Sequence, residues 1–122
     1  MYVVEGSDLH PSISMDFSSG FFRIAGKSIP ENPWQVYQPV LDHLIDYSNR
    51  PQTDTVMEIE LEFFNTSTSK MLLDIIGELE RLHKTGDSNV LVKWIYTDED
   101  MLEVGEDFKH LMDLPFDLIS LE

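Results

Sequence analysis

The sequence predicts a single α/β domain, a mixed β-sheet with helices mainly on one face and the element order β-β-α-β-α-β-α-β. Short apolar segments alternate with longer segments of helical periodicity, which is typical of parallel strands joined by helical crossovers. Residues 55–65 alternate between apolar and acidic side chains, which indicates a sheet with one face exposed. The chain of 122 residues shows no internal repeat, linker or low-complexity segment, so we expect residues 1–122 to form one domain.

A β-hairpin is expected first, with strands at Ser12–Phe17 and Phe21–Gly26. The two apolar runs are separated by "SSG", and a three-residue connection that ends in glycine is typical of a hairpin. The residues before Ser12 are expected to form a tail.

A helix is expected next, because Asn32 is a suitable N-cap and Pro33 is favoured at the first helical position. Pro39 lies inside this segment, so we expect a kink or two short helices there. The segment ends at "NRP", which begins at Asn49. Its apolar residues follow near-helical spacing and are Trp34, Tyr37, Leu41, Leu44, Ile45 and Tyr47.

The segment 55–65 is predicted to be a strand with one buried face and one acidic face. The buried set is expected to be Met57, Ile59, Leu61 and Phe63, opposite Glu58, Glu60 and Glu62. Phe64 would then fall on the acidic face, where the next turn covers it or where it serves as an exposed anchor for a partner.

The second half of the chain continues the alternation of helices and strands. A helix is expected from Lys70 to about Gly86, followed by a strand at Val90–Tyr96, a helix over residues 98–113 and a last strand at Phe116–Leu121. The apolar stripes of the two helices are Leu72, Ile75, Ile76, Leu79 and Leu82 in the first, and Leu102, Phe108, Leu111 and Met112 in the second.

The chain is strongly acidic, with 23 acidic and 8 basic residues and a formal net charge of -15. Such a surface repels phosphate backbones and anionic lipids, so neither nucleic acid nor a membrane is an expected partner, whereas basic protein surfaces are favoured. The sequence has no cysteine, no signal-peptide pattern and no run of about 20 apolar residues. We therefore expect a cytoplasmic protein.

Enzyme chemistry is not expected. The four histidines, at positions 10, 43, 83 and 110, form no metal-binding pair, and the chain contains no G-x-S-x-G motif and no glycine-rich phosphate loop. The acidic run after Thr97 lacks the ligand spacing of a calcium loop. We expect no metal and no cofactor, and a small hydrolase stays only as an alternative.

A run of four hydroxyl residues, Thr66, Ser67, Thr68 and Ser69, separates the strand at 55–65 from the following helix. One of them could act as an N-cap while its neighbours make local turn contacts. The other interpretation is phosphorylation, since the amino end of a helix tolerates a phosphate and Lys70 offers a counter-charge. Spacing alone does not decide between the two.

Three stretches together resemble one family over nearly the whole chain. They are "AGKSIPENPWQVYQPVLDHLIDY", "IELEFFNTSTSKMLLDIIGELE" and "VLVKWIYTDEDMLEVGEDF", which contain a G-x-S-x-P-E-N segment, an Asn-Thr-Ser turn between strand and helix, and an acidic helix. They resemble the SiaC-type bacterial regulatory phosphoproteins, which have a fold similar to that of STAS domains (sulfate transporter and anti-sigma factor antagonist).

The resemblance implies a non-enzymatic switch. A GHKL-type serine/threonine kinase would phosphorylate a threonine, a PP2C-type phosphatase would remove the phosphate, and the unmodified form would activate a diguanylate cyclase that controls cyclic-di-GMP and biofilm growth. The matching threonine is Thr66, and Thr68 and Ser69 extend the hydroxyl run beyond the family pattern, so that Ser67, Thr68 and Ser69 are secondary candidates. The expected partner-binding residues are Phe64, Asn65, Thr66, Ser67 and Lys70. An anti-sigma factor antagonist that controls transcription is the alternative within the same fold.

Overall fold

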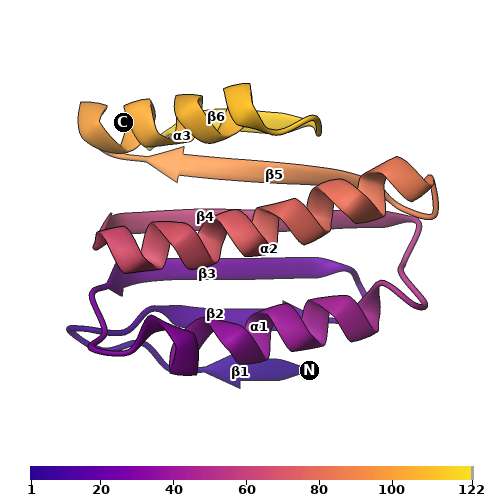
Figure 1. Ribbon diagram of the computed structural model, residues 1–122, viewed down its shortest axis with the longest axis horizontal. Coiled ribbons are helices and arrows are strands. Elements are labelled where there is room, and N and C mark those ends of the chain that lie inside the picture. Colours follow the sequence, from indigo (N-terminus) through magenta and orange to yellow (C-terminus); the bar gives the residue numbers. More distant parts are fainter. Residues whose placement is uncertain (122) are drawn as a thin grey trace.

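The computed structural model describes residues 1–121, in which three helices cover one face of a six-stranded sheet (Figure 1). The strands are β1 (Tyr2–Val4), β2 (Ser12–Asp16), β3 (Phe21–Ser28), β4 (Asp54–Phe64), β5 (Asn89–Tyr96) and β6 (Phe116–Ser120). The helices are α1 (Pro33–Tyr47), α2 (Thr66–Thr85) and α3 (Glu99–Leu111). The predicted fold class is confirmed, with one additional strand at the amino end of the predicted order.

The strands lie in sequence order across the sheet. β1, β2 and β3 pair in antiparallel fashion, whereas β3, β4, β5 and β6 are parallel, as the alternation of strands and helices predicted. β1 replaces part of the expected tail: Tyr2 pairs with Met15, and Val4 pairs with Ile13. A strand of three residues is too short for its alternation to be recognised, and it forms here because Tyr2 and Val4 pack against the core.

The core lies between the sheet and the helices, and its largest fully buried side chains include Trp94, Tyr37 and Phe22. Trp94 on β5 also anchors α3, because its indole Nε1 donates a hydrogen bond to the carbonyl oxygen of Met101 at 2.9 Å. Gly105 of α3 lies directly against the indole ring, and a Cβ at this position would overlap it. The glycine therefore allows α3 to approach β5 closely.

α1 is one continuous helix of 15 residues that includes Pro39, so the expectation of two short helices is wrong. The proline removes one backbone hydrogen bond, but burial of one helix face outweighs this loss. The periodicity also placed Trp34 and Ile45 in the buried stripe, yet their exposed fractions are 59% and 46%. The stripe starts one turn later than expected and consists of Tyr37, Val40, Leu44 and Tyr47.

The end of β4 departs from the predicted alternation at a β-bulge. Pairing with β3 is regular up to Leu61, but the next paired residue is Phe63, opposite Lys27, so Glu62 is an extra residue on β4. One extra residue exchanges the two faces of a strand. The prediction for this pair is therefore wrong: Phe63 is 45% exposed, with the Lys27 ammonium group 5.7 Å from its ring, whereas Phe64 is half-buried against the core.

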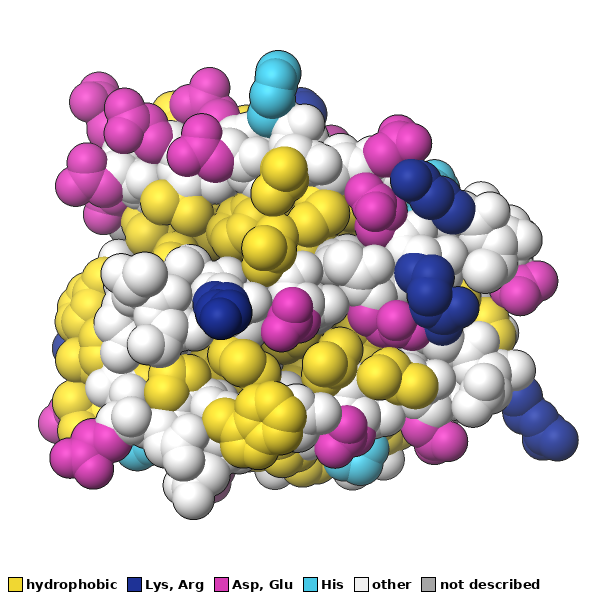
Figure 2. Space-filling model, in the orientation of Figure 1, with side chains coloured by type: hydrophobic (Ala, Val, Ile, Leu, Met, Phe, Trp, Pro, Cys, Tyr) yellow, Lys and Arg dark blue, Asp and Glu magenta, His cyan; other side chains and the backbone are white. Residues whose placement is uncertain are grey.

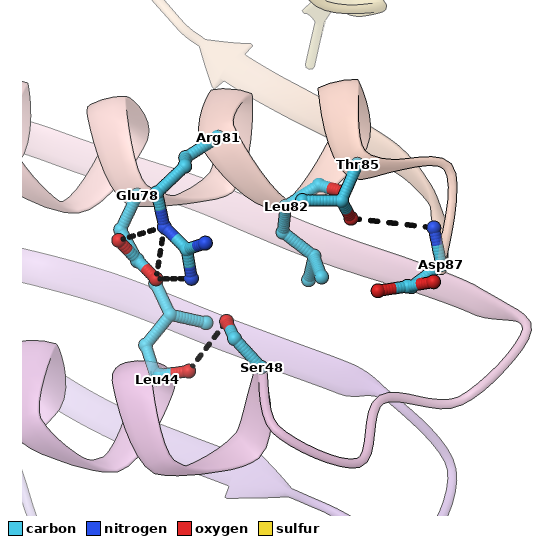
Figure 3. A network of polar contacts seen from close by, with 7 residues as sticks. All are labelled: Leu44, Ser48, Glu78, Arg81, Leu82, Thr85 and Asp87. Atoms are coloured by element: carbon cyan, nitrogen blue, oxygen red, sulfur yellow. Dashed lines mark hydrogen bonds and ion pairs between the residues drawn. The ribbon is translucent and has the colours of Figure 1, made fainter.

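α2 begins at Thr66, four residues before the expected start at Lys70. Its carboxyl end is where the sequence predicted it, because Gly86 adopts a left-handed conformation with φ of 80°. In the last turn, the Thr85 hydroxyl donates a hydrogen bond to the carbonyl oxygen of Leu82 at 2.7 Å. The Thr85 hydroxyl oxygen accepts a hydrogen bond from the Asp87 N–H at 3.3 Å (Figure 3). Because α2 begins at Thr66, the four hydroxyl residues belong to the first turn of the helix and not to a loop before it.

Candidate functional site

The turn from β4 into α2 is capped by Asn65. Its side-chain Oδ1 accepts a hydrogen bond from the Thr68 N–H at 2.9 Å, and its carbonyl oxygen accepts one from the Ser69 N–H at 3.2 Å. Its Nδ2 group donates to the carbonyl oxygen of Pro30 at 3.5 Å, which ties the cap to the loop before α1. The capping role considered for a hydroxyl residue is filled by the asparagine.

The four hydroxyl side chains have different surroundings. Thr66 and Ser67 are exposed, Ser69 is half-buried and Thr68 is completely buried. The Ser69 hydroxyl donates a hydrogen bond to the carbonyl oxygen of Thr66 at 2.7 Å, which is a local contact within the first turn. Thr66 and Ser67 are therefore the hydroxyl residues that another protein can reach most readily.

Thr68 does not suit the expectation that it is a secondary phosphorylation site. Its exposed fraction is 0%, and its hydroxyl donates to the carbonyl oxygen of Ser28 at 3.1 Å. A phosphate at this position would have to be buried without its own set of donors, which is costly for a charged group. The helical period places Thr68 at the start of the buried stripe of α2, three residues before Met71.

A groove of about 630 Å³ opens beside this turn, between α2 and α3. Figure 2 shows hydrophobic side chains gathered between these two helices. The lining residues are Phe64, Asn65, Thr66, Ser67, Ser69, Lys70, Leu73, Val104, Asp107, Phe108 and Leu111. Every predicted site residue except Thr68 thus lies at one groove, with the exposed hydroxyls next to an apolar wall.

Phe64 forms part of this wall and is not an isolated exposed anchor. Its ring meets the ring of Trp94 edge-on, with centroids 6.3 Å apart, and Trp94 in turn lies 5.5 Å from Phe108. Phe108 is buried, but it still contributes to the groove lining. The apolar wall is therefore a continuation of the core and has a fixed shape.

The groove borders an acidic part of the fold. Figure 2 shows acidic side chains gathered over the amino end of α3. Along its length this helix exposes Glu99, Asp100, Glu103, Glu106 and Asp107. Within the groove lining taken from residues 1–121, Lys70 is the one cationic side chain. This balance favours a partner surface that is apolar with basic residues at its edge.

Four apolar residues of the groove were not predicted as site residues: Leu73, Val104, Phe108 and Leu111. The sequence placed Leu111 in the buried stripe of its helix, yet its side chain is 66% exposed. Leu73 lies next to the buried stripe of α2 and was not singled out. Since the groove depends on the separation of two helices, no local pattern in either helix marks it.

The histidines lie elsewhere. His43 packs against the ring of Tyr2 with centroids 4.5 Å apart, and Nδ1 of His83 accepts a hydrogen bond from the Val90 N–H at 3.1 Å. Within residues 1–121, no group of three or more histidine, aspartate or glutamate side chains could hold a metal ion. None of the helices in that range has both the length and the apolar character needed to cross a membrane.

Comparison with known proteins gives consistent results. The sequence pattern of the SiaC family regulatory phosphoproteins matches residues 4–121. A protein of Pseudomonas aeruginosa strain UCBPP-PA14 is 29% identical over 115 residues, which are 93% of this chain and 90% of the relative.

Solved structures from Pseudomonas aeruginosa resemble the whole fold. SiaC matches with a TM-score of 0.89 and 28% identity, covering 98% of this chain and 99% of that chain. A crystal structure of the diguanylate cyclase SiaD in complex with its activator SiaC contains a chain that matches with a TM-score of 0.92 and 27% identity, with the same coverage. The similarity therefore extends over the sheet and the three helices.

Proposed function

The chain belongs to the SiaC family of regulatory phosphoproteins, and from this premise we propose that it is a phosphorylation-controlled activator of a diguanylate cyclase. The unmodified protein binds the cyclase and raises the production of cyclic-di-GMP, which favours biofilm growth. Phosphorylation of Thr66 ends this binding. The family consists of regulatory proteins, so the prediction of a non-enzymatic function is confirmed.

The similarity to an activator in complex with its cyclase supports the choice of partner. The groove between α2 and α3 supports the choice of surface, because it combines a fixed apolar wall with an acidic border. A basic and apolar surface on the cyclase would complement both features. Nucleic acid and membranes stay excluded as expected partners, because a net charge of -15 repels phosphate groups and anionic lipids.

The position of Thr66 is the observation that carries the switch. Its side chain is exposed, lines the groove and belongs to the first residue of α2. A phosphate adds a charge of about -1.5 to -2 at pH 7. On the bound surface this charge would be taken out of water against the apolar wall of the groove, and the cost of desolvating it there opposes binding. The phosphate can thus block the groove without reshaping the domain.

A GHKL-type serine/threonine kinase and a PP2C-type phosphatase are the proposed enzymes of the cycle, as the family resemblance implies. Both need access to the hydroxyl, which the exposed side chain of Thr66 offers. Ser67 is the best placed secondary candidate because it is also exposed, whereas Ser69 donates its hydroxyl to the Thr66 carbonyl oxygen.

Titration calorimetry with the purified cyclase tests the proposal. Thr66→Ala should bind with the affinity of the wild type and should not respond to the kinase. Thr66→Asp should bind at least about tenfold more weakly, because an unpaired carboxylate is placed in the interface. The phosphorylated wild type should be weaker still, since a phosphate carries more charge than a carboxylate.

Thr97→Asp is the matched control. Thr97 is exposed at the carboxyl end of the neighbouring strand and does not line the groove, so this variant adds the same charge outside the site. It should bind like the wild type. Equal affinity of the wild type, Thr66→Asp and the phosphorylated protein would show that Thr66 does not control the contact.

A further inference from the structure

Three buried hydroxyl groups lie beneath the turn that carries Thr66. They belong to Ser28 at the end of β3, Tyr37 on α1 and Thr68 on α2, and each residue has an exposed fraction of 0%. The Ser28 Oγ atom is 2.6 Å from the Tyr37 hydroxyl and 3.1 Å from Thr68 Oγ1. The cluster therefore joins three separate elements at one point.

The donors and acceptors of this cluster can be assigned, and the protons are donated in the order Tyr37 to Ser28 to Thr68 to the Ser28 carbonyl oxygen. The Thr68 hydroxyl donates to the carbonyl oxygen of Ser28 at 3.1 Å, so its oxygen must accept the proton of the Ser28 hydroxyl. The Ser28 oxygen then accepts from Tyr37. Burial raises the pKa of the Tyr37 hydroxyl to about 12, so this donor keeps its proton at neutral pH.

The carbonyl oxygen of Ser28 accepts hydrogen bonds from the two residues that flank Thr66 and Ser67. It accepts the Asn65 N–H at 3.2 Å and the Thr68 hydroxyl at 3.1 Å. Thr66 and Ser67 are the two residues between these anchors. With Asn65 and Thr68 fixed inward, the backbone presents Thr66 and Ser67 outward at the groove.

We propose that Ser28, Tyr37 and Thr68 are positioning residues of the switch, which fix the first turn of α2 in the conformation that is read by the partner. None of the three lines the groove, so they act through Asn65 and the turn and not by contact. The expected effect on partner binding rests on the proposed function, but the effect on the conformation of the turn can be measured without any partner.

The chain contains a matched control for this proposal. A second buried hydroxyl cluster joins Tyr47 to Thr55 at 2.8 Å and Thr55 to Ser88 at 2.7 Å. It uses another tyrosine of α1, and Thr55 has an exposed fraction of 0%, like Thr68. This cluster lies at the amino end of β4, whereas Thr68 follows its carboxyl end. Valine at either threonine keeps the shape of the side chain and removes its hydrogen bonds.

Amide hydrogen exchange of Thr68→Val and Thr55→Val is the first measurement. Thr68→Val should speed exchange of the Ser69 and Lys70 amides by about tenfold or more, because the turn loses its anchor on Ser28. Thr55→Val should leave these two amides close to the wild-type rates when both variants are compared at the same temperature below their own Tm. Tyr37→Phe, which removes the far end of the hydrogen-bond chain, should show a smaller change of the same kind. Equal acceleration in Thr68→Val and Thr55→Val, or none in Thr68→Val, would overturn the inference.

Cyclase affinity is the second measurement. Thr68→Val should bind about tenfold more weakly than the wild type, and Thr55→Val should bind equally well. Equal losses in both variants would reduce the cluster to a purely stabilising role and overturn the inference. If the wild type itself binds no diguanylate cyclase, the proposed function is wrong, and the exchange rates alone then decide whether the cluster fixes the turn.

Discussion

Gly105 determines how closely α3 lies against the sheet, and so it helps to determine the width of the groove. A Cβ at this position would overlap the indole ring of Trp94 and approach the Leu118 side chain to 2.8 Å. Gly105→Ala should therefore lower the free energy of unfolding by about 1–3 kcal/mol through overpacking, as measured by urea denaturation.

Gly77 offers the opposite case within α2. A Cβ added there would meet no atom within 4 Å. Gly77→Ala should raise the free energy of unfolding by roughly 0.5–1 kcal/mol, because alanine is the better helix former. If Gly105→Ala raised stability as Gly77→Ala is expected to do, the close packing of α3 on Trp94 would not be the constraint described above.

At the same scale, the chemistry of single residues could be predicted only in part. The family resemblance predicts that Thr66 is the modified residue, which stays a prediction, and its side chain is exposed. Thr68 stayed a secondary candidate, because it is a threonine in the same run of hydroxyl residues. The distinction comes from the helical period, which turns Thr68 toward Ser28, and it could be seen only once the start of α2 was known.

The elements were predicted well where a pattern ran over several turns or strand positions. The sequence missed features that depend on one residue or on a neighbouring element. The bulge at Glu62 exchanges Phe63 and Phe64, and it follows from pairing with β3, which the sequence of β4 alone does not reveal. β1 is too short to show a period.

The first turn of α2 gives a prediction at the level of the element. Asn65→Ala removes the Oδ1 acceptor of the Thr68 N–H and should lower the free energy of unfolding by about 1 kcal/mol. Asn65→Asp keeps an acceptor of the same shape and should retain most of that stability. Thermal unfolding of the two variants compares them, and equal losses would mean that the amide contact with the Pro30 carbonyl oxygen, and not the cap, is what matters.

At the scale of the whole molecule, the site arises from the arrangement of helices and not from any one of them. The residues of the turn were predicted as site residues from the sequence. The apolar wall that they border also includes Leu73 on α2 and Val104 on α3, which were not predicted. Its existence depends on α2 packing toward α1 while α3 stays close to β5 and β6. Such spacing is a property of the packed fold, so it could not be predicted from periodicity.

The net charge of -15 gives the last prediction, because it acts on the whole molecule. Repulsion among the acidic side chains opposes the compact state, and salt screens it over distances of about 10 Å at 0.1 M ionic strength. Sodium chloride between 0.02 and about 0.5 M should therefore raise the free energy of unfolding by about 1 kcal/mol, or roughly 4 °C in Tm for a domain of this size. A variant that neutralises three exposed glutamates, Glu62, Glu103 and Glu106, to glutamine should be more stable at low salt and should respond less to added salt. If the variant and the wild type gained stability equally with salt, the gain would come from general exclusion of the salt from the protein surface, and self-repulsion would not be the dominant electrostatic effect in this fold.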